Sequence, residues 1–162
     1  MPPLALIGVP SSAGARRAGQ ETAPAALRAA GLVGSLCAAG LEVADLGDLP
    51  TVSYRPDPDH PDRQNLPLVA AVARQTADRV DRALAAGRLP LVIGGDCSLT
   101  LGVIAGVLRH DLSPGLLYVD GDVDLNTPET SPSGVFEGMV LAHALGRGVH
   151  TPCSLAPQSL SG

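Results

Sequence analysis

Three aspartates at alternating positions carry the strongest chemical signal in the sequence. Asp120, Asp122 and Asp124 follow a short apolar run, at 116–119. On an extended chain alternate side chains project to the same side, so these carboxylates would crowd one another. Their repulsion raises each pKa unless a cation neutralises them, and hard divalent ions prefer oxygen ligands. The pattern indicates either a divalent metal site or an Asp-rich turn whose carboxylates accept nearby N–H groups.

The sequence lacks the common calcium-binding and nucleotide-binding motifs. Counting from Asp120, positions six and twelve are Leu125 and Ser131, whereas an EF-hand loop needs Gly and Glu there. The sequence also contains no Walker A loop and no G-x-G-x-x-G pattern.

Cys97 is the second chemical candidate. It lies in the turn Gly94-Gly95-Asp96-Cys97-Ser98, and Ser98 is a suitable N-cap for a following helix. A thiol at a helix N-terminus can be partly ionised, and hence a metal ligand or nucleophile; the alternative is a small buried residue in a tight turn. A cysteine hydrolase also needs a histidine base, and none of the four histidines has an evident spacing for it. For His143, within a helical pattern, we expect a packing or surface role.

Glu137 ends a polar loop, 131–138, at the point where a helix begins. A carboxylate at a helix start often serves only as a favourable partner for the helix dipole. Whether Glu137 has a chemical role therefore depends on what surrounds it.

Alternating apolar runs and helical patterns must position these side chains. We expect strands at 4–9, 41–46, 89–93 and 116–119, helices at 23–39, 66–86 and 99–108, and a long surface loop at 47–64. This order predicts a parallel sheet covered by helices. Ligands of such sheets bind beyond the carboxyl ends of the strands, where Cys97 and the aspartates would lie.

Composition narrows the possible partners. The net charge is −5, and there is neither a basic cluster nor an aromatic platform, which argues against nucleic acid and against an anionic membrane surface. Three widely spaced cysteines predict no disulfide framework and favour the cytoplasm. The first apolar run is soon broken by Pro10 and Gly14, so we expect no signal peptide and no membrane span.

Taken together, five collinear segments resemble the arginase and agmatinase (ureohydrolase) family, most closely its arginase branch. They are 6–10, 22–32, 45–50, 94–99 and 120–138, and the stretch from Asn126 to Gly134 looks like the amino-acid-binding loop of arginases. The resemblance implies an α/β, three-layer arginase-like fold with a mostly parallel sheet, truncated to about its first four strands. We expect this domain at 1–147, followed by an irregular tail at 148–162.

In that family two Mn²⁺ ions activate a hydroxide that attacks a guanidinium carbon and releases urea. The resemblance implies Asp124 and Glu137 as catalytic residues and Asn126 and Ser133 as substrate contacts; the implied metal ligands are Cys97, Asp120, Asp122 and Asp124. Cys97, Asp122 and Glu137 stand where the family has histidine, and Val135 stands where it has a substrate-binding Asn. The altered ligand types allow Mg²⁺, Ca²⁺ or Zn²⁺ in place of Mn²⁺.

The family chain is about twice as long, and its second half supplies a further Asp-x-Asp ligand pair. A half-sheet would also leave an open strand edge, so we expect a homo-oligomer. We therefore hold three hypotheses: a shortened amidinohydrolase acting on an arginine-like guanidino substrate, a non-catalytic pseudoenzyme or assembly subunit, and one half of a split or truncated enzyme.

Overall fold

The sheet is built around β1 (Leu4–Val9), whose six residues are all buried. It pairs in parallel with β2 (Val43–Asp48) on one side and with β3 (Leu89–Gly94) on the other, giving the order β2-β1-β3. The computed structural model describes residues 1–110, 112 and 114–148. The predicted tail therefore lies outside the described residues except for Gly148, and so does Cys153.

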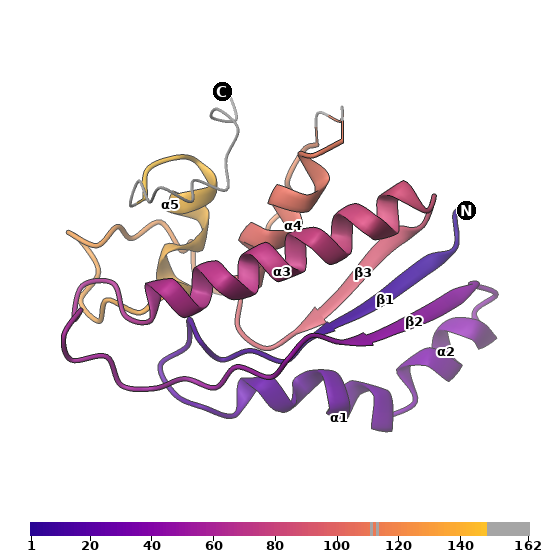
Figure 1. Cartoon of the computed structure of the whole chain (residues 1–162), viewed down its shortest axis with the longest axis horizontal. Helices are drawn as coiled ribbons and strands as arrows, with labels where there is room; N and C mark the ends of the chain where they lie inside the picture. Colours follow the sequence, from indigo (N-terminus) through magenta and orange to yellow (C-terminus); the bar gives the residue numbers. More distant parts are fainter. Residues whose placement is uncertain (111, 113, 149–162) are drawn as a thin grey trace.

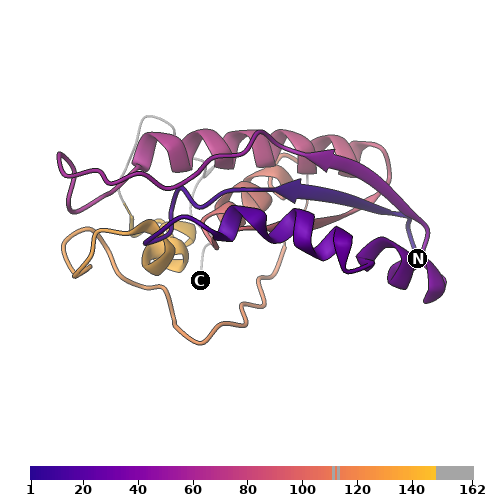
Figure 2. The same ribbon diagram turned by 90° about the horizontal axis from the view of Figure 1, so that it is seen from below.

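Helices cover both faces of the sheet, as the α/β prediction requires. Figure 2 shows α3 (Leu66–Ala85) on one face and α1 (Ala23–Ala29) with α2 (Leu32–Ala38) on the other. A further helix, α4 (Leu99–Val107), packs against α3 on the β3 side (Figure 1). The chain then reaches two short elements, η2 (Phe136–Met139) and α5 (Val140–Ala144); a 3-10 turn, η1 (Gln20–Thr22), precedes α1.

The main core lies between β1 and α3. Ala5, Ile7 and Val9 point from the strand toward Val72 and Val80 of the helix, and all five are buried. Small residues let α4 approach α3 closely: a Cβ added at Gly102 would lie 2.5 Å from the Ala73 carbonyl oxygen. Among the described residues, no helix is long and apolar enough to cross a membrane.

The single helix predicted at 23–39 is wrong, because the chain forms two helices separated at Ala30 and Gly31. Gly31 has φ 85°, a left-handed conformation that ends a helix and that glycine adopts at little cost. β2 correspondingly begins two residues later than expected and runs to Asp48. The other predicted strands and helices, apart from the last strand, agree with the structure to within one residue at each end.

The fourth strand predicted at 116–119 is also wrong. This segment is extended but belongs to no strand, and Figure 2 shows it running apart from the sheet. Leu117 and Val119 are 88% and 87% exposed. Their apolar character suits a strand, but a strand forms only where another strand offers a partner edge. The sheet of the described residues therefore has three strands.

One ionic cluster joins α1 to β2. The Arg28 guanidinium donates to both carboxylate oxygens of Asp45, at 2.7 and 2.9 Å, and to Asp48 at 2.5 Å. The hydrogen bonds from the Arg28 guanidinium hold the pKa of Asp45 below its ordinary value. Because these bonds need an ionised carboxylate, their contribution to stability is present above the ordinary aspartate pKa and is lost as the pH falls through the lower, folded value.

We predict that Arg28→Met lowers the free energy of unfolding by about 1 kcal/mol at pH 7, since the pair is bidentate but partly exposed. The difference from the unchanged chain should shrink below about pH 4. Urea unfolding followed by circular dichroism measures both quantities. Arg17→Met, at an exposed position, is the matched control and should change stability by less than about 0.5 kcal/mol. A pH-independent loss would contradict the ionic origin.

Candidate functional site

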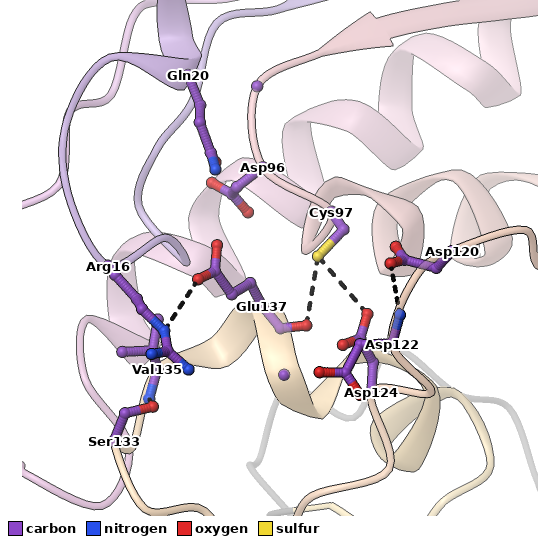
Figure 3. A pocket seen from close by; sticks show the side chains of 12 residues that line it. Arg16, Gln20, Asp96, Cys97, Asp120, Asp122, Asp124, Ser133, Val135 and Glu137 are labelled. Carbon is purple, nitrogen blue, oxygen red and sulfur yellow. Dashed lines mark hydrogen bonds and ion pairs between the residues drawn. The ribbon is translucent and has the colours of Figure 1, made fainter.

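A cavity of about 360 Å³ opens beyond the carboxyl ends of β1 and β3, where the strand order predicted a ligand site. Four loop segments line it: the one after β1, the turn after β3, the aspartate segment, and the stretch leading into η2 (Figure 3). The lining residues are Arg16, Gln20, Gly95, Asp96, Cys97, Asp120, Asp122, Asp124, Ser133, Val135, Glu137 and Gly138.

Asp96 ties two of these segments together. Its carboxylate is 2% exposed and accepts the Gly14 N–H at 3.2 Å, the Ser11 hydroxyl at 3.3 Å and the Ser98 N–H at 2.9 Å; the Ser98 hydroxyl also donates to it. Ser98 therefore does not cap α4 with its side chain, as its position suggested. The buried carboxylate instead holds the loop after β1 against the turn after β3.

Cys97 follows Asp96, whose hydrogen bonds we call the Asp96 clamp, and its side chain points into the cavity. Its Sγ donates to the Glu137 carbonyl oxygen at 3.3 Å and lies 3.9 Å from Asp124 Oδ2. Burial, and then the negative charge of Asp124, raise the pKa of Cys97 to about 12. The thiol is therefore protonated at neutral pH, in contrast to the thiolate that a helix N-terminus alone would favour.

The three aspartates have different environments. Asp124 is buried, has φ 47°, and accepts the Tyr118 hydroxyl at 2.5 Å. Asp120 is exposed and accepts the Asp122 N–H at 3.0 Å, while Asp122 accepts the Val123 N–H. Two of the three thus form the Asp-rich turn that was the alternative to a metal site.

All four predicted metal ligands line the same cavity. Within the part of the chain that the structure describes, however, no three His, Cys, Asp or Glu side chains gather closely enough to hold a metal ion. As placed, the described residues do not fit a metal ion.

Glu137 occupies the first turn of η2, and its N–H donates to the Gly14 carbonyl at 2.9 Å. Burial raises the pKa of its carboxyl; Arg16 acts in the opposite direction, and Asp96 adds to the rise. The Nε of Arg16 lies 3.5 Å from Glu137 Oε1, so a guanidinium already reaches this carboxylate (Figure 3).

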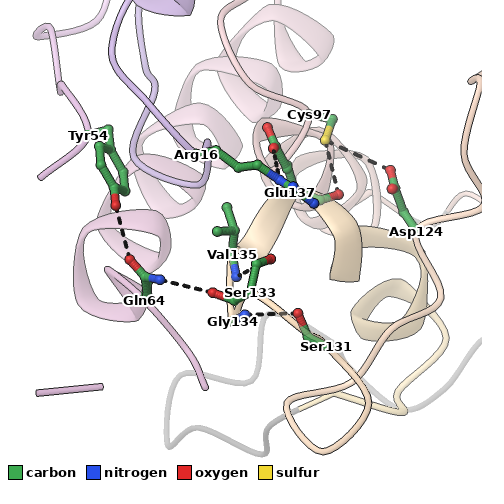
Figure 4. A network of polar contacts seen from close by, with 10 residues as sticks. All are labelled: Arg16, Tyr54, Gln64, Cys97, Asp124, Ser131, Ser133, Gly134, Val135 and Glu137. Carbon is green, nitrogen blue, oxygen red and sulfur yellow. Dashed lines mark hydrogen bonds and ion pairs between the residues drawn. The ribbon is translucent and has the colours of Figure 1, made fainter. Parts of the chain in front are cut away.

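The predicted substrate loop is anchored to the loop before α3 (Figure 4). Tyr54 donates to Gln64, whose side-chain amide donates to the Ser133 carbonyl at 2.9 Å. Gly134 has φ 63°, and a Cβ there would lie 1.8 Å from the Pro61 carbonyl oxygen. Ser133 lines the cavity as expected, whereas Asn126 is not among the lining residues; its N–H donates to the Gly138 carbonyl at 3.1 Å.

Sequence reasoning missed three residues of this site. Arg16 and Gln20 come from the loop after β1, and the carboxyl-end rule could have drawn attention to them because β1 is the central strand. Tyr118 was counted only as part of an apolar run. His143 has the packing role that was predicted: its ring centroid lies 4.4 Å from that of Phe136, and burial lowers its pKa.

The chain is a parallel α/β protein with an acid-lined cavity at the carboxyl end of its sheet, the place where α/β proteins that bind small molecules hold them. The particular family follows from comparison with known proteins. The family described as "Arginase family" matches residues 2–157, and the chain belongs to it. It is 40% identical over 150 residues to an arginase of Bacillus caldovelox and 38% identical over 146 residues to the mitochondrial arginase-2 of Bos taurus.

Solved structures agree with this assignment. The crystal structure of a Bacillus cereus arginase superposes with a TM-score of 0.81 at 39% identity, covering 92% of this chain and 49% of that one. An Entamoeba histolytica arginase in complex with L-ornithine gives 0.84 at 30% identity, covering 98% and 54%. The Bacillus caldovelox match covers 91% of this chain and 50% of the relative. The chain thus spans about half the length of the relatives that it matches.

We predict that Asp96→Asn lowers the free energy of unfolding by about 2 kcal/mol, because an amide cannot accept all the buried donors and adds two of its own. Denaturant unfolding measures the loss. Asp122→Asn is the matched control: it lines the same cavity but is exposed, so we expect a change within about 0.5 kcal/mol. Equal effects of the two substitutions would contradict the stabilising role of the Asp96 clamp.

Proposed function

We propose that this chain is the pocket-bearing part of an arginase-type amidinohydrolase, acting on a guanidino substrate whose C–N bond is cleaved to release urea. The observation that carries the proposal is the Arg16–Glu137 ion pair, since it is a guanidinium–carboxylate contact inside the cavity of an arginase-family fold. In that pair Arg16 stands in for the guanidino group of the substrate.

Charge favours the same ligand class. Five acidic side chains line the cavity, Asp96, Asp120, Asp122, Asp124 and Glu137, against the single cation of Arg16. Such a cavity attracts cations, and a planar guanidinium matches a carboxylate through two parallel hydrogen bonds. Glu137 is the group best placed to receive it, because its carboxylate is partly buried and only one exposed arginine competes for it.

Each lining side chain would have a distinct part in binding. Glu137 would accept the guanidino N–H groups, and Ser133 would offer a hydroxyl to the polar end of the ligand. Val135 supplies an apolar wall where the family has an Asn, which weakens selection for an α-amino acid end. Asp96 would act indirectly, by holding the Cys97 turn in place.

A divalent cation supplies the hydroxide nucleophile in arginases, with Mn²⁺ expected here by resemblance and Mg²⁺, Ca²⁺ or Zn²⁺ as alternatives. The described residues do not gather three ligands for it. We therefore assign guanidino binding to this chain and assign turnover to a site completed by further ligands. The Cys97 thiol stands where the family has a metal-binding histidine and donates to the Glu137 carbonyl oxygen, which favours a second candidate, a non-catalytic family member that binds the ligand without cleaving it.

We predict that Glu137→Gln raises the dissociation constant for L-arginine about tenfold, the loss of one charged hydrogen-bonding partner. Isothermal titration calorimetry with L-arginine, agmatine and guanidinium chloride measures the effect. Arg16→Ala should act in the opposite direction, because it removes the competing guanidinium. Glu129→Gln, an exposed carboxylate of the neighbouring loop, is the matched control and should leave affinity unchanged. Equal loss of affinity for L-arginine in Glu137→Gln and Glu129→Gln would contradict the proposal.

A second prediction concerns metal and turnover. After dialysis against Mn²⁺, Mg²⁺, Ca²⁺ or Zn²⁺, mass spectrometry of the metal content should find less than one ion per chain. Urea release from L-arginine, hydroxyarginine and agmatine should not exceed that of Asp124→Asn. Stoichiometric metal together with urea release that Asp124→Asn abolishes would overturn the assignment of turnover to further ligands.

A further inference from the structure

One peptide group in the wall of the cavity is held at both of its polar ends. It joins Ser133, which lines the cavity, to Gly134. Its carbonyl oxygen accepts from the Gln64 side-chain amide at 2.9 Å, and its N–H donates to Ser131 Oγ at 3.0 Å (Figure 4). The Gln64 N–H donates in addition to the Gly134 carbonyl oxygen at 2.9 Å. Because a peptide group is planar, bonds at both of its ends fix its orientation.

The backbone of this loop does not fix that orientation by itself. Gly134 has φ 63°, and glycine adopts positive and negative φ almost equally well. Rotation of the peptide plane changes φ of Gly134 and ψ of Ser133, so on the glycine side it meets little resistance. The position of Ser133 therefore depends strongly on bonds from outside the loop, and Gln64 supplies two of them.

Hydrogen-bonding chemistry leaves one orientation for the Gln64 amide. A carbonyl oxygen can only accept, so the NH₂ group must face Ser133, and the amide oxygen is left to accept from the Tyr54 hydroxyl at 3.2 Å. Tyr54 is itself anchored, because its N–H donates at 2.9 Å to the hydroxyl of Ser12, which is fully buried beyond the end of β1. The hydrogen bonds thus run in one direction, from Tyr54 through Gln64 to Ser133.

Gln64 and Tyr54 reach the cavity only through Ser133. Neither of them is among the described residues that line the cavity, whereas Ser133 is. The Ser133 Oγ accepts the Val135 N–H at 3.4 Å, so the hydrogen of its hydroxyl can be donated to a ligand. The Ser133 hydroxyl therefore suits an acceptor group of a ligand whose guanidinium binds Glu137.

We propose that Gln64, oriented by Tyr54, is a positioning residue that sets the Ser133 hydroxyl and thereby selects ligands with an acceptor group in addition to a guanidinium. This role presupposes the proposed function, in which Glu137 receives the guanidinium. L-Arginine carries a carboxylate acceptor, whereas the guanidinium ion has no acceptor. Loss of the bond from Gln64 to Ser133 should therefore weaken binding of L-arginine and spare binding of guanidinium.

Gln64→Glu tests this role, because its carboxylate still accepts from Tyr54 but places an oxygen against the Ser133 carbonyl. We expect the dissociation constant for L-arginine to rise about tenfold and that for guanidinium chloride to change less than about twofold. Calorimetric titration measures the first constant, and NMR titration measures the second because a small cation binds weakly. Gln64→Met removes the donor without adding charge and should act in the same direction. Tyr54→Phe should raise the L-arginine constant about threefold.

Gln75→Glu is the matched control, because it makes the same substitution at an exposed position of α3 and should leave both constants unchanged. Equal weakening of both ligands in Gln64→Glu and Gln64→Met would indicate a general structural role and overturn the proposal. An unchanged L-arginine constant in both variants would also overturn it. Failure of the unchanged chain to bind guanidinium chloride would instead contradict the proposed function, and with it the role of Gln64.

Discussion

The architecture of the cavity depends on one buried carboxylate. Asp96 accepts donors from Ser11 and Gly14 beyond β1 and from Ser98 beyond β3, and so fixes two adjacent strand ends relative to each other. The Gly14 carbonyl in turn accepts the Glu137 N–H, which sets the start of η2 over the cavity. Three segments far apart in the sequence are thereby held by a single side chain and one backbone bond.

Electrostatic repulsion is the second constraint on the cavity. Five carboxylates share a small space, and the described part of the chain relieves their repulsion with hydrogen-bond donors. The Tyr118 hydroxyl donates to Asp124, and the Asp122 N–H donates to Asp120. The Cys97 thiol keeps its proton because burial and the neighbouring charge oppose ionisation.

Most of the fold could be predicted from the sequence because burial leaves a clear pattern in the main elements. β1 is buried throughout and is an uninterrupted apolar run, and α3 is buried on one face and is a long amphipathic repeat. The break at Gly31 is a local glycine signal that the helical pattern of the flanking residues obscured. The failure of 116–119 to form a strand could not be predicted, because a strand depends on a partner edge rather than on local preference. In the site, Cys97, Asp124, Ser133 and Glu137 were identified from motifs. Arg16, Gln20 and Tyr118 were missed because no local pattern distinguishes them from surface or core residues.

The contact of Gly134 with Pro61 has a consequence for loop grafting. Because Gly134 has φ 63° and no room for a Cβ, the predicted substrate loop and the loop before α3 fit each other closely, and the bond from Gln64 to Ser133 also joins them. An engineer who transplants 126–138 from a relative to change ligand preference must transplant 54–64 with it. Exchange of either loop alone would disrupt the contacts between the two loops beside the cavity.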